Sequence, residues 1–140
     1  MRKTRRNAGR AGVVAAALGL SMLVTAGGAH ADSIPDNLCG GVIDVDYCLW
    51  YNSNQKGGWT STYENISNWA NWNFSDGGQG TNGIGTPVKN NAASYANSRD
   101  DKTGVSYFNS NYAGASDVAP PRDLGNLVKT YNNNASFRWR

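Results

Sequence analysis

The 140-residue chain has a formal net charge of +3, but five of its 13 Lys and Arg residues and none of its 10 acidic residues precede residue 32. After residue 31 the balance is eight bases against ten acids, or −2, so the charge gives no support to nucleic-acid binding. The only histidine, His30, belongs to the same leading segment. The rest of the chain therefore lacks the residues for a Ser-His-Asp triad, a Cys-His dyad or histidine-ligated zinc.

Residues 1–31 have the pattern of a secretory signal peptide. Basic residues at positions 2–10 precede an apolar run over 11–26, and Ala29 and Ala31 form a small-x-small cleavage site. The apolar run is shorter than the roughly 20 residues that a membrane span needs. We therefore predict a secreted protein that is free of the membrane after cleavage, with one domain over residues 32–140.

The first predicted strand covers residues 42–51. Apolar residues, including Tyr47, Leu49 and Tyr51, occupy one parity of this segment, as a strand with one buried face requires. Cys48 lies on the other parity, and Cys39 is the only other cysteine. In a secreted chain these two are most simply a disulfide, which closes a short loop and contributes roughly 2–3 kcal/mol in the chain-entropy model.

Short strands and turns are predicted for the remainder, because asparagine and glycine are abundant and helix formers are few. Asn65 is expected to cap a single helical turn, and residues 77–85 to form a glycine-rich loop. Strands are expected at 88–95, 105–109 and 137–139, with a charged turn at 99–102. Residues 115–122 are expected to form an exposed extended loop, because Pro120 and Pro121 remove ladder donors.

The segment from Tyr107 to Gly114, which reads YFNSNYAG, predicts a folded hairpin. Asn and Ser reverse the chain, a positive φ is permitted at Gly114, and Tyr112 can fold back to pack near Tyr107. A similar phrase, WYNSNQKG, runs from Trp50 to Gly57. Repeats of this kind indicate a tandem of similar units.

A second repeated phrase follows each hairpin. It has the form Asn-Asn-x-x-Ser-aromatic and ends in Ser94-Tyr95 and in Ser136-Phe137. The same order of motifs therefore occurs twice. It predicts two β-units, at about residues 38–95 and 96–140.

The ordered motifs resemble those of the βγ-crystallin fold, an all-β sandwich of two Greek-key motifs. In that fold a serine clamps each folded hairpin. The positions that match the fold pattern are Trp50, Gly57, Ser94, Tyr107, Tyr112, Gly114 and Ser136. Within that fold the chain is most similar to the secreted actinobacterial peptidase inhibitors of family I36, through these motifs together with Cys39 and Cys48.

The resemblance implies a non-enzymatic inhibitor of an extracellular protease, of the thermolysin-like metalloproteinase class, that acts through an exposed loop as a monomer and requires no cofactor. The family's second disulfide, which ties its reactive loop, has no counterpart here. A rigid substrate-like loop binds well because its ordering costs are met beforehand. The expected inhibitory loop comprises Ala115, Ser116, Asp117, Val118, Ala119, Pro120, Pro121 and Arg122.

Calcium binding is an alternative function from a different class. Paired βγ units can hold calcium in clamps of the form Asn/Asp-Asn/Asp-x-x-Ser/Thr-Ser, whose oxygen ligands suit this ion. The matching residues are Asn90, Asn91 and Ser94 in one unit and Asn132, Asn133 and Ser136 in the other. Neither clamp contains a carboxylate, so weak affinity is expected, in the ~10⁻⁴ to 10⁻³ M class.

Two further alternatives rest on single residue types. Trp59, Trp69 and Trp72 could stack on the sugar rings of a glycan or cell wall, or complete a small core. Paired carboxylates, either Asp44 with Asp46 or Asp100 with Asp101, could in principle serve a glycosidase. Adjacent acids in a turn are more often only solvated, so we do not expect an enzyme.

Overall fold

A computed structural model describes Cys39 and residues 47–140 of the chain. The predicted signal peptide and residues 42–46 of the first predicted strand lie outside this range. The described residues form strands and one short 3-10 turn, which confirms the all-β prediction. In chain order these elements are β1 (Tyr47–Asn52), β2 (Lys56–Thr62), η1 (Trp69–Asn71), β3 (Asp76–Gln79), β4 (Ser94–Asn97), β5 (Gly104–Asn109), β6 (Ala113–Ala119), β7 (Asp123–Asn126) and β8 (Ser136–Trp139).

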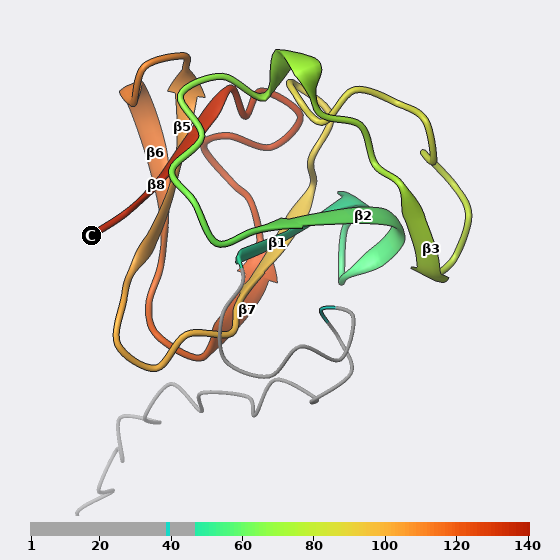
Figure 1. Cartoon of the computed structure of the whole chain (residues 1–140), viewed down its shortest axis with the longest axis horizontal. Helices are drawn as coiled ribbons and strands as arrows, with labels where there is room; N and C mark the ends of the chain where they lie inside the picture. Colours follow the sequence, from blue (N-terminus) through green and yellow to red (C-terminus); the bar gives the residue numbers. More distant parts are fainter. Residues whose placement is uncertain (1–38, 40–46) are drawn as a thin grey trace, which may run out of the picture.

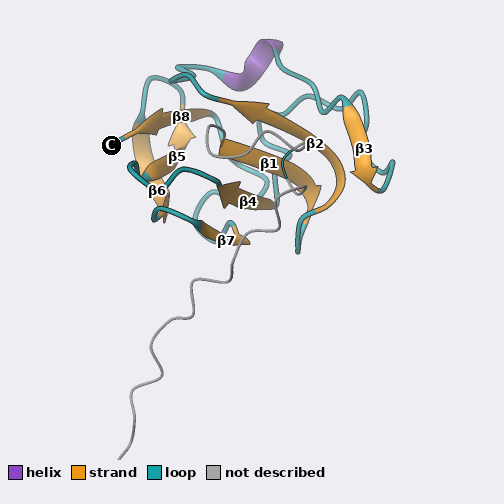
Figure 2. Ribbon diagram, turned by 60° about the horizontal axis from the view of Figure 1, so that its bottom comes forward, coloured by secondary structure: helices purple, strands orange, loops and turns teal. Residues whose placement is uncertain are grey.

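The strands form two antiparallel sheets, with the orders β3-β2-β1-β4-β7 and β6-β5-β8. Figure 1 shows the smaller sheet standing to one side of the larger one, and Figure 2 shows the same arrangement from a second direction. A buried hydrogen bond of 3.0 Å between the hydroxyls of Tyr47 and Ser106 joins the two sheets. Strands β2 and β5 each begin or end at a hairpin whose register shifts at the turn.

The two repeated units share both sheets. Strand β7 comes from the second unit but pairs with β4 of the first. In return, Ile66 of the first unit forms a β-bridge with Phe137 of β8, through reciprocal backbone hydrogen bonds of 2.8 Å. Each unit therefore completes its sheet with a segment of the other.

Strand β1 is buried on both faces. Tyr47 and Leu49 point into the main core, where the Tyr47 ring stacks on Phe137 at 4.1 Å. Cys48 and Trp50, on the opposite parity, pack in a second cluster with Cys39. The predicted disulfide between Cys39 and Cys48 is present, and it ties Cys39 to the outer face of β1.

Three predicted elements differ from the structure. The predicted strand over residues 88–95 is extended only from Ser94, because Asn90 has a φ of 64° and the chain turns there. The helical turn begins after Asn68, whose side chain accepts a hydrogen bond from the Ala70 N–H. Asn65 instead accepts a hydrogen bond from the Trp139 N–H. The glycine-rich stretch predicted as a loop contains part of β3.

The predicted loop over residues 115–122 is also wrong as a secondary-structure assignment. Its first five residues belong to β6, the edge strand of the smaller sheet, which pairs with β5. Proline excludes only positions 120 and 121 from the ladder, so it does not prevent pairing before them. The segment is an edge strand followed by a turn; its members are Ala115, Ser116, Asp117, Val118 and Ala119 in the strand, and Pro120, Pro121 and Arg122 after it.

Candidate functional site

The second hairpin adopts the predicted folded form. Asn111 and Tyr112 have φ values of 60° and 61°, and the rings of Tyr107 and Tyr112 lie 6.1 Å apart. Gly114 has a φ of 82°, and a Cβ there would come within 2.8 Å of the Asn109 side chain. Glycine is therefore required at this position for both backbone and space.

Each hairpin is held by the predicted serine. The buried Ser136 hydroxyl accepts a hydrogen bond from the Tyr112 N–H at 3.0 Å and donates to the Asn109 carbonyl at 2.7 Å. In the first unit the buried Ser94 hydroxyl accepts from the Gln55 N–H at 3.0 Å and donates to the Asn52 carbonyl at 2.6 Å. The two corners therefore have the same hydrogen-bond pattern.

The two Asn-rich turns lie side by side. The Asn90 N–H donates to the Asn134 carbonyl at 2.8 Å, and the Asn132 N–H donates to the Ala92 carbonyl at 2.9 Å. Asn134 adds two buried side-chain bonds, accepting from the Ala92 N–H and donating to the Val88 carbonyl. The first residue of each clamp thus bonds the third residue of the other.

The predicted calcium ligands are in part already engaged. The Asn91 amide donates to the carbonyls of Pro87 and Lys89, and the Asn133 amide donates to the Tyr131 carbonyl. These bonds use the amide nitrogens and leave the side-chain oxygens as acceptors. Among the described residues, no group of three or more His, Cys, Asp and Glu side chains could hold a metal ion. Calcium binding by the asparagines stays a prediction.

The tryptophans do not form a shared platform for sugar rings. Trp69 is completely buried in the core, with the partly exposed Trp72 packed edge-on against it at 5.3 Å. Trp59 packs instead near Trp50, in the cluster around the disulfide. The interpretation of Trp69 as a sugar-stacking residue is therefore wrong, because its ring completes the core.

The predicted carboxylate pair in the charged turn is solvated. Asp100 and Asp101 are exposed, and both Asp101 oxygens accept hydrogen bonds from the Arg99 guanidinium, at 2.7 and 2.8 Å. The Arg99 hydrogen bonds are the main cause that lowers the pKa of Asp101. A glycosidase acid would need a raised pKa instead. Asp44 and Asp46 lie outside the described residues.

Strand β6 presents one exposed apolar side chain between two anchored residues. Val118 is 53% exposed, whereas its neighbour Asp117 points to the sandwich interior beside Ser106. The Asp117 carboxylate accepts hydrogen bonds from the N–H groups of residues 128, 129 and 130 at 2.8–3.2 Å, and from the Thr130 hydroxyl at 2.7 Å. Partial burial would raise the pKa of Asp117, but these hydrogen bonds outweigh it and lower the pKa.

Asn97 holds the other end of the candidate segment. Its buried amide lies 2.8–3.0 Å from three backbone carbonyls, those of Lys102, Ala119 and Pro120. Its side-chain oxygen accepts from the Arg99 N–H at 3.1 Å. Sequence reasoning did not identify this residue. The available signal was a polar side chain on the same parity as Tyr95 in a buried strand.

Arg122 completes this anchorage in the turn after Pro121. It has a φ of 56°, and its N–H donates to the Arg99 carbonyl at 2.8 Å. Its guanidinium donates to the Ser98 carbonyl, also at 2.8 Å. The turn that follows β6 is therefore bonded to the turn that follows β4.

Comparison with known proteins identifies the fold. No family model and no curated protein matches the chain. Among solved structures, the N-terminal domain of Protein S has a TM-score of 0.52 and 18% identity, over 69% of this chain and 96% of that one. A structure described under the evolution of the eye lens βγ-crystallin domain fold has a TM-score of 0.52 and 7% identity, over 70% of this chain and 87% of that one. The chain has the βγ-crystallin fold. No helix among the described residues could cross a membrane.

Proposed function

We propose that this protein is a secreted inhibitor of an extracellular peptidase, and that it presents the end of β6 and the following turn to the active-site cleft. One observation carries the proposal: Val118 is exposed on an extended edge strand and is anchored on both sides. Asp117 anchors the side before it, and Asn97 anchors the side after it. In this proposal the protein acts as a monomer, without a required cofactor, nucleic acid or membrane.

An edge strand already has the conformation that an extended substrate adopts. Its outer backbone groups can add a strand to a partner, while its side chains enter pockets. Because β6 is paired with β5, little ordering cost is left for binding. The side-chain anchors take the place of the second disulfide that the resembling inhibitors use in this region.

The anchors also explain how cleavage would be resisted. If a bond next to Val118 were cut, Asp117 would stay bonded to residues 128–130, and the carbonyls of Ala119 and Pro120 would stay bonded to Asn97. The new ends would remain in place, so product release would be slow and the bond could re-form.

The test is a titration of the mature protein against a thermolysin-like metalloproteinase and a serine peptidase. We expect loss of one enzyme's activity at near-equal molar ratio, with the inhibitor intact or cut once within residues 115–122. Val118→Asn should weaken inhibition by about 30-fold, as for a hot-spot residue worth ~2 kcal/mol. The matched control is Val128→Asn, because Val128 is also exposed (79%) but lies outside the segment. Equal inhibition by both variants would contradict the proposal.

A second candidate function, calcium binding, is favoured by the geometry of the Asn-rich turns. Asn90 and Asn132 are exposed, have positive φ, and begin two turns that contact each other. For a dissociation constant of ~10⁻⁴ to 10⁻³ M, 10 mM calcium would stabilise the fold by about 1.4–2.7 kcal/mol. Thermal melting with calcium or magnesium measures this. No rise in Tm, or the same rise in the Asn90→Ala/Asn132→Ala variant, would count against it.

A further inference from the structure

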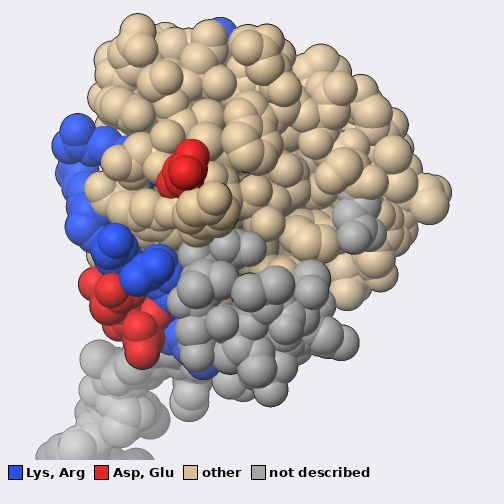
Figure 3. All heavy atoms as spheres, in the orientation of Figure 1, with Lys and Arg blue, Asp and Glu red and all other residues tan. Residues whose placement is uncertain are grey.

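Two arginines lie on one face of the last strand. Arg138 is in β8 opposite Val105, and Arg140 continues the pairing through reciprocal backbone bonds with Thr103. Residues two apart in a strand point to the same face, about 7 Å apart. Figure 3 shows Lys and Arg atoms gathered along the edge of the molecule where the chain ends in Figure 1.

A pair of tyrosines holds both guanidinium groups. The Arg138 guanidinium lies 5.6 Å from the centre of the Tyr112 ring. The Arg140 guanidinium lies 5.9 Å from the Tyr107 ring and donates to the Tyr107 hydroxyl at 2.8 Å. Because the two rings also contact each other, the four side chains form one preorganised group.

Neither guanidinium has an acidic partner. Among the described residues the only ion pair within 4.0 Å is that of Arg99 with Asp101. The Nε atom of Arg138 is moreover buried without a hydrogen-bond partner in this part of the chain. A buried unpaired donor is costly, and a bound acceptor would remove that cost.

The corner motif does not require these residues. Aligned on the two serines, Ala96 and Ser98 of the first unit take the places of Arg138 and Arg140. Gln55 takes the place of Tyr112. The first corner nevertheless makes the same serine bonds, so the arginine-tyrosine group has a role other than folding the hairpin.

We propose that Arg138 and Arg140 form a binding site for sulfate or phosphate ester groups of an extracellular polysaccharide. A guanidinium presents donors that pair with anionic oxygens, and one guanidinium can satisfy a carboxylate. Two guanidiniums fixed side by side suit an ester group with three terminal oxygens. Because two arginines attract an anionic membrane only weakly, a soluble polymer with repeated groups is the favoured partner.

The experiment measures binding of fluorescein-labelled dextran sulfate and phosphorylated dextran to the mature protein by anisotropy. Carboxymethyl dextran of equal charge density and vesicles of phosphatidylserine and phosphatidylcholine are the comparison probes. We expect the ester polymers to bind at least 10-fold more tightly than carboxymethyl dextran. Tighter binding to the carboxylated polymer or to the vesicles would overturn the proposal.

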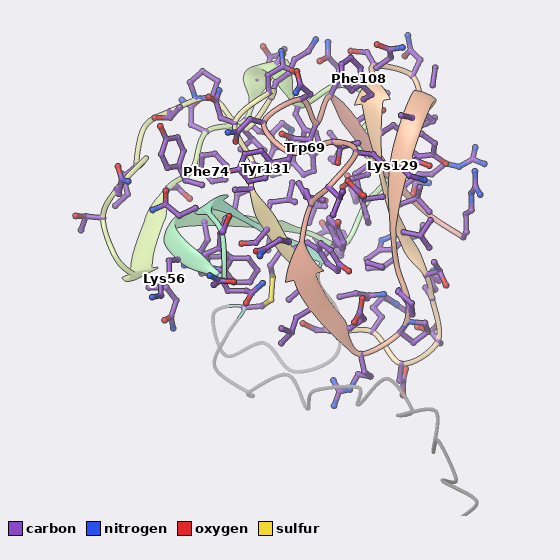
Figure 4. All side chains as sticks on the ribbon, turned by 180° about the vertical axis from the view of Figure 1, so that it is seen from behind. Lys56, Trp69, Phe74, Phe108, Lys129 and Tyr131 are labelled. Atoms are coloured by element: carbon purple, nitrogen blue, oxygen red, sulfur yellow. A yellow bond between two sulfur atoms is a disulfide. The ribbon has the colours of Figure 1, made fainter. Side chains whose placement is uncertain are left out.

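Variants separate local geometry from net charge. Arg138→Gln and Arg140→Gln should each weaken binding at least 5-fold, and Lys56→Gln, which removes the same charge, less than 2-fold. Figure 4 shows Lys56 on the side of the molecule away from the β6-β5-β8 sheet. An equal loss in all three variants would mean non-specific attraction and would overturn the proposal.

Two further variants leave the net charge unchanged. Arg138→Lys keeps the charge but loses the planar fork, and Tyr112→Gln introduces the residue found in the first unit. Each should weaken binding about 3-fold, with a melting curve confirming that the variant is folded. Unchanged binding in both folded variants would contradict a site built on positioned guanidiniums.

Discussion

Ser94 and Ser136 each satisfy two backbone groups of a hairpin from a buried position. Replacing either serine by alanine leaves an N–H and a carbonyl unpaired, so we expect a loss of about 1–3 kcal/mol in the free energy of unfolding. Chemical denaturation measures the loss. Ser61→Ala on strand β2 is the control and should change stability by less than about 0.5 kcal/mol. An unaltered midpoint for both clamp variants would contradict the paired-corner interpretation.

Asp117 links stability to pH. Its hydrogen bonds lower its pKa in the folded state, so the stabilisation is present above the unfolded value of about 3.9 and is lost as pH falls through the folded value. Asp117→Asn should cost roughly 1–3 kcal/mol at neutral pH, because the amide cannot accept all of these bonds. Denaturation between pH 2 and 7 should show the wild type and the variant converging at the acidic end. A constant difference would exclude the charged form as the cause.

At the scale of elements, β5 depends on a glycine that faces the other sheet. A Cβ on Gly104 would approach the Tyr47 ring at 2.8 and 2.9 Å and the Phe137 ring at 3.0 Å. Both rings are buried and stacked on each other, so they cannot move aside easily. We expect Gly104→Ala to lower stability by about 1–3 kcal/mol through overpacking. Gly85→Ala is not a fair control because its φ is positive; Ser116→Ala on the paired strand is, and it should be nearly neutral.

The elements also show where sequence patterns were sufficient. Alternation predicted the faces of β1 correctly, because Tyr47 and Leu49 enter the main core. It did not find β7, because its residues, Asp123–Asn126, include one Leu and no alternating pattern. This strand forms because β4 offers it an edge, so tertiary pairing overrides weak local propensity. The same holds for β6, which forms on the edge of β5.

At the scale of the whole molecule, each unit completes its sheet with a segment of the other. We therefore expect neither residues 32–95 nor residues 96–140 to fold alone, because each would expose a sheet edge and half of the core. Circular dichroism and thermal melting of the separate halves should show no cooperative transition, and mixing them should restore one. A cooperative transition in either isolated half would show that the units are independent.

The sequence by itself determined the all-β class, the disulfide, the two hairpin corners and the serines that clamp them. These are local features, since turn residues, glycine and short-range spacing specify them within each unit. The tertiary structure alone decided that β6 is an edge strand, that Asn97 gathers three carbonyls, and that Trp69 belongs to the core. It also brought two tyrosines and two arginines together. These features depend on contacts between segments distant in the chain, and spacing along one segment carries no record of which strand will lie beside it.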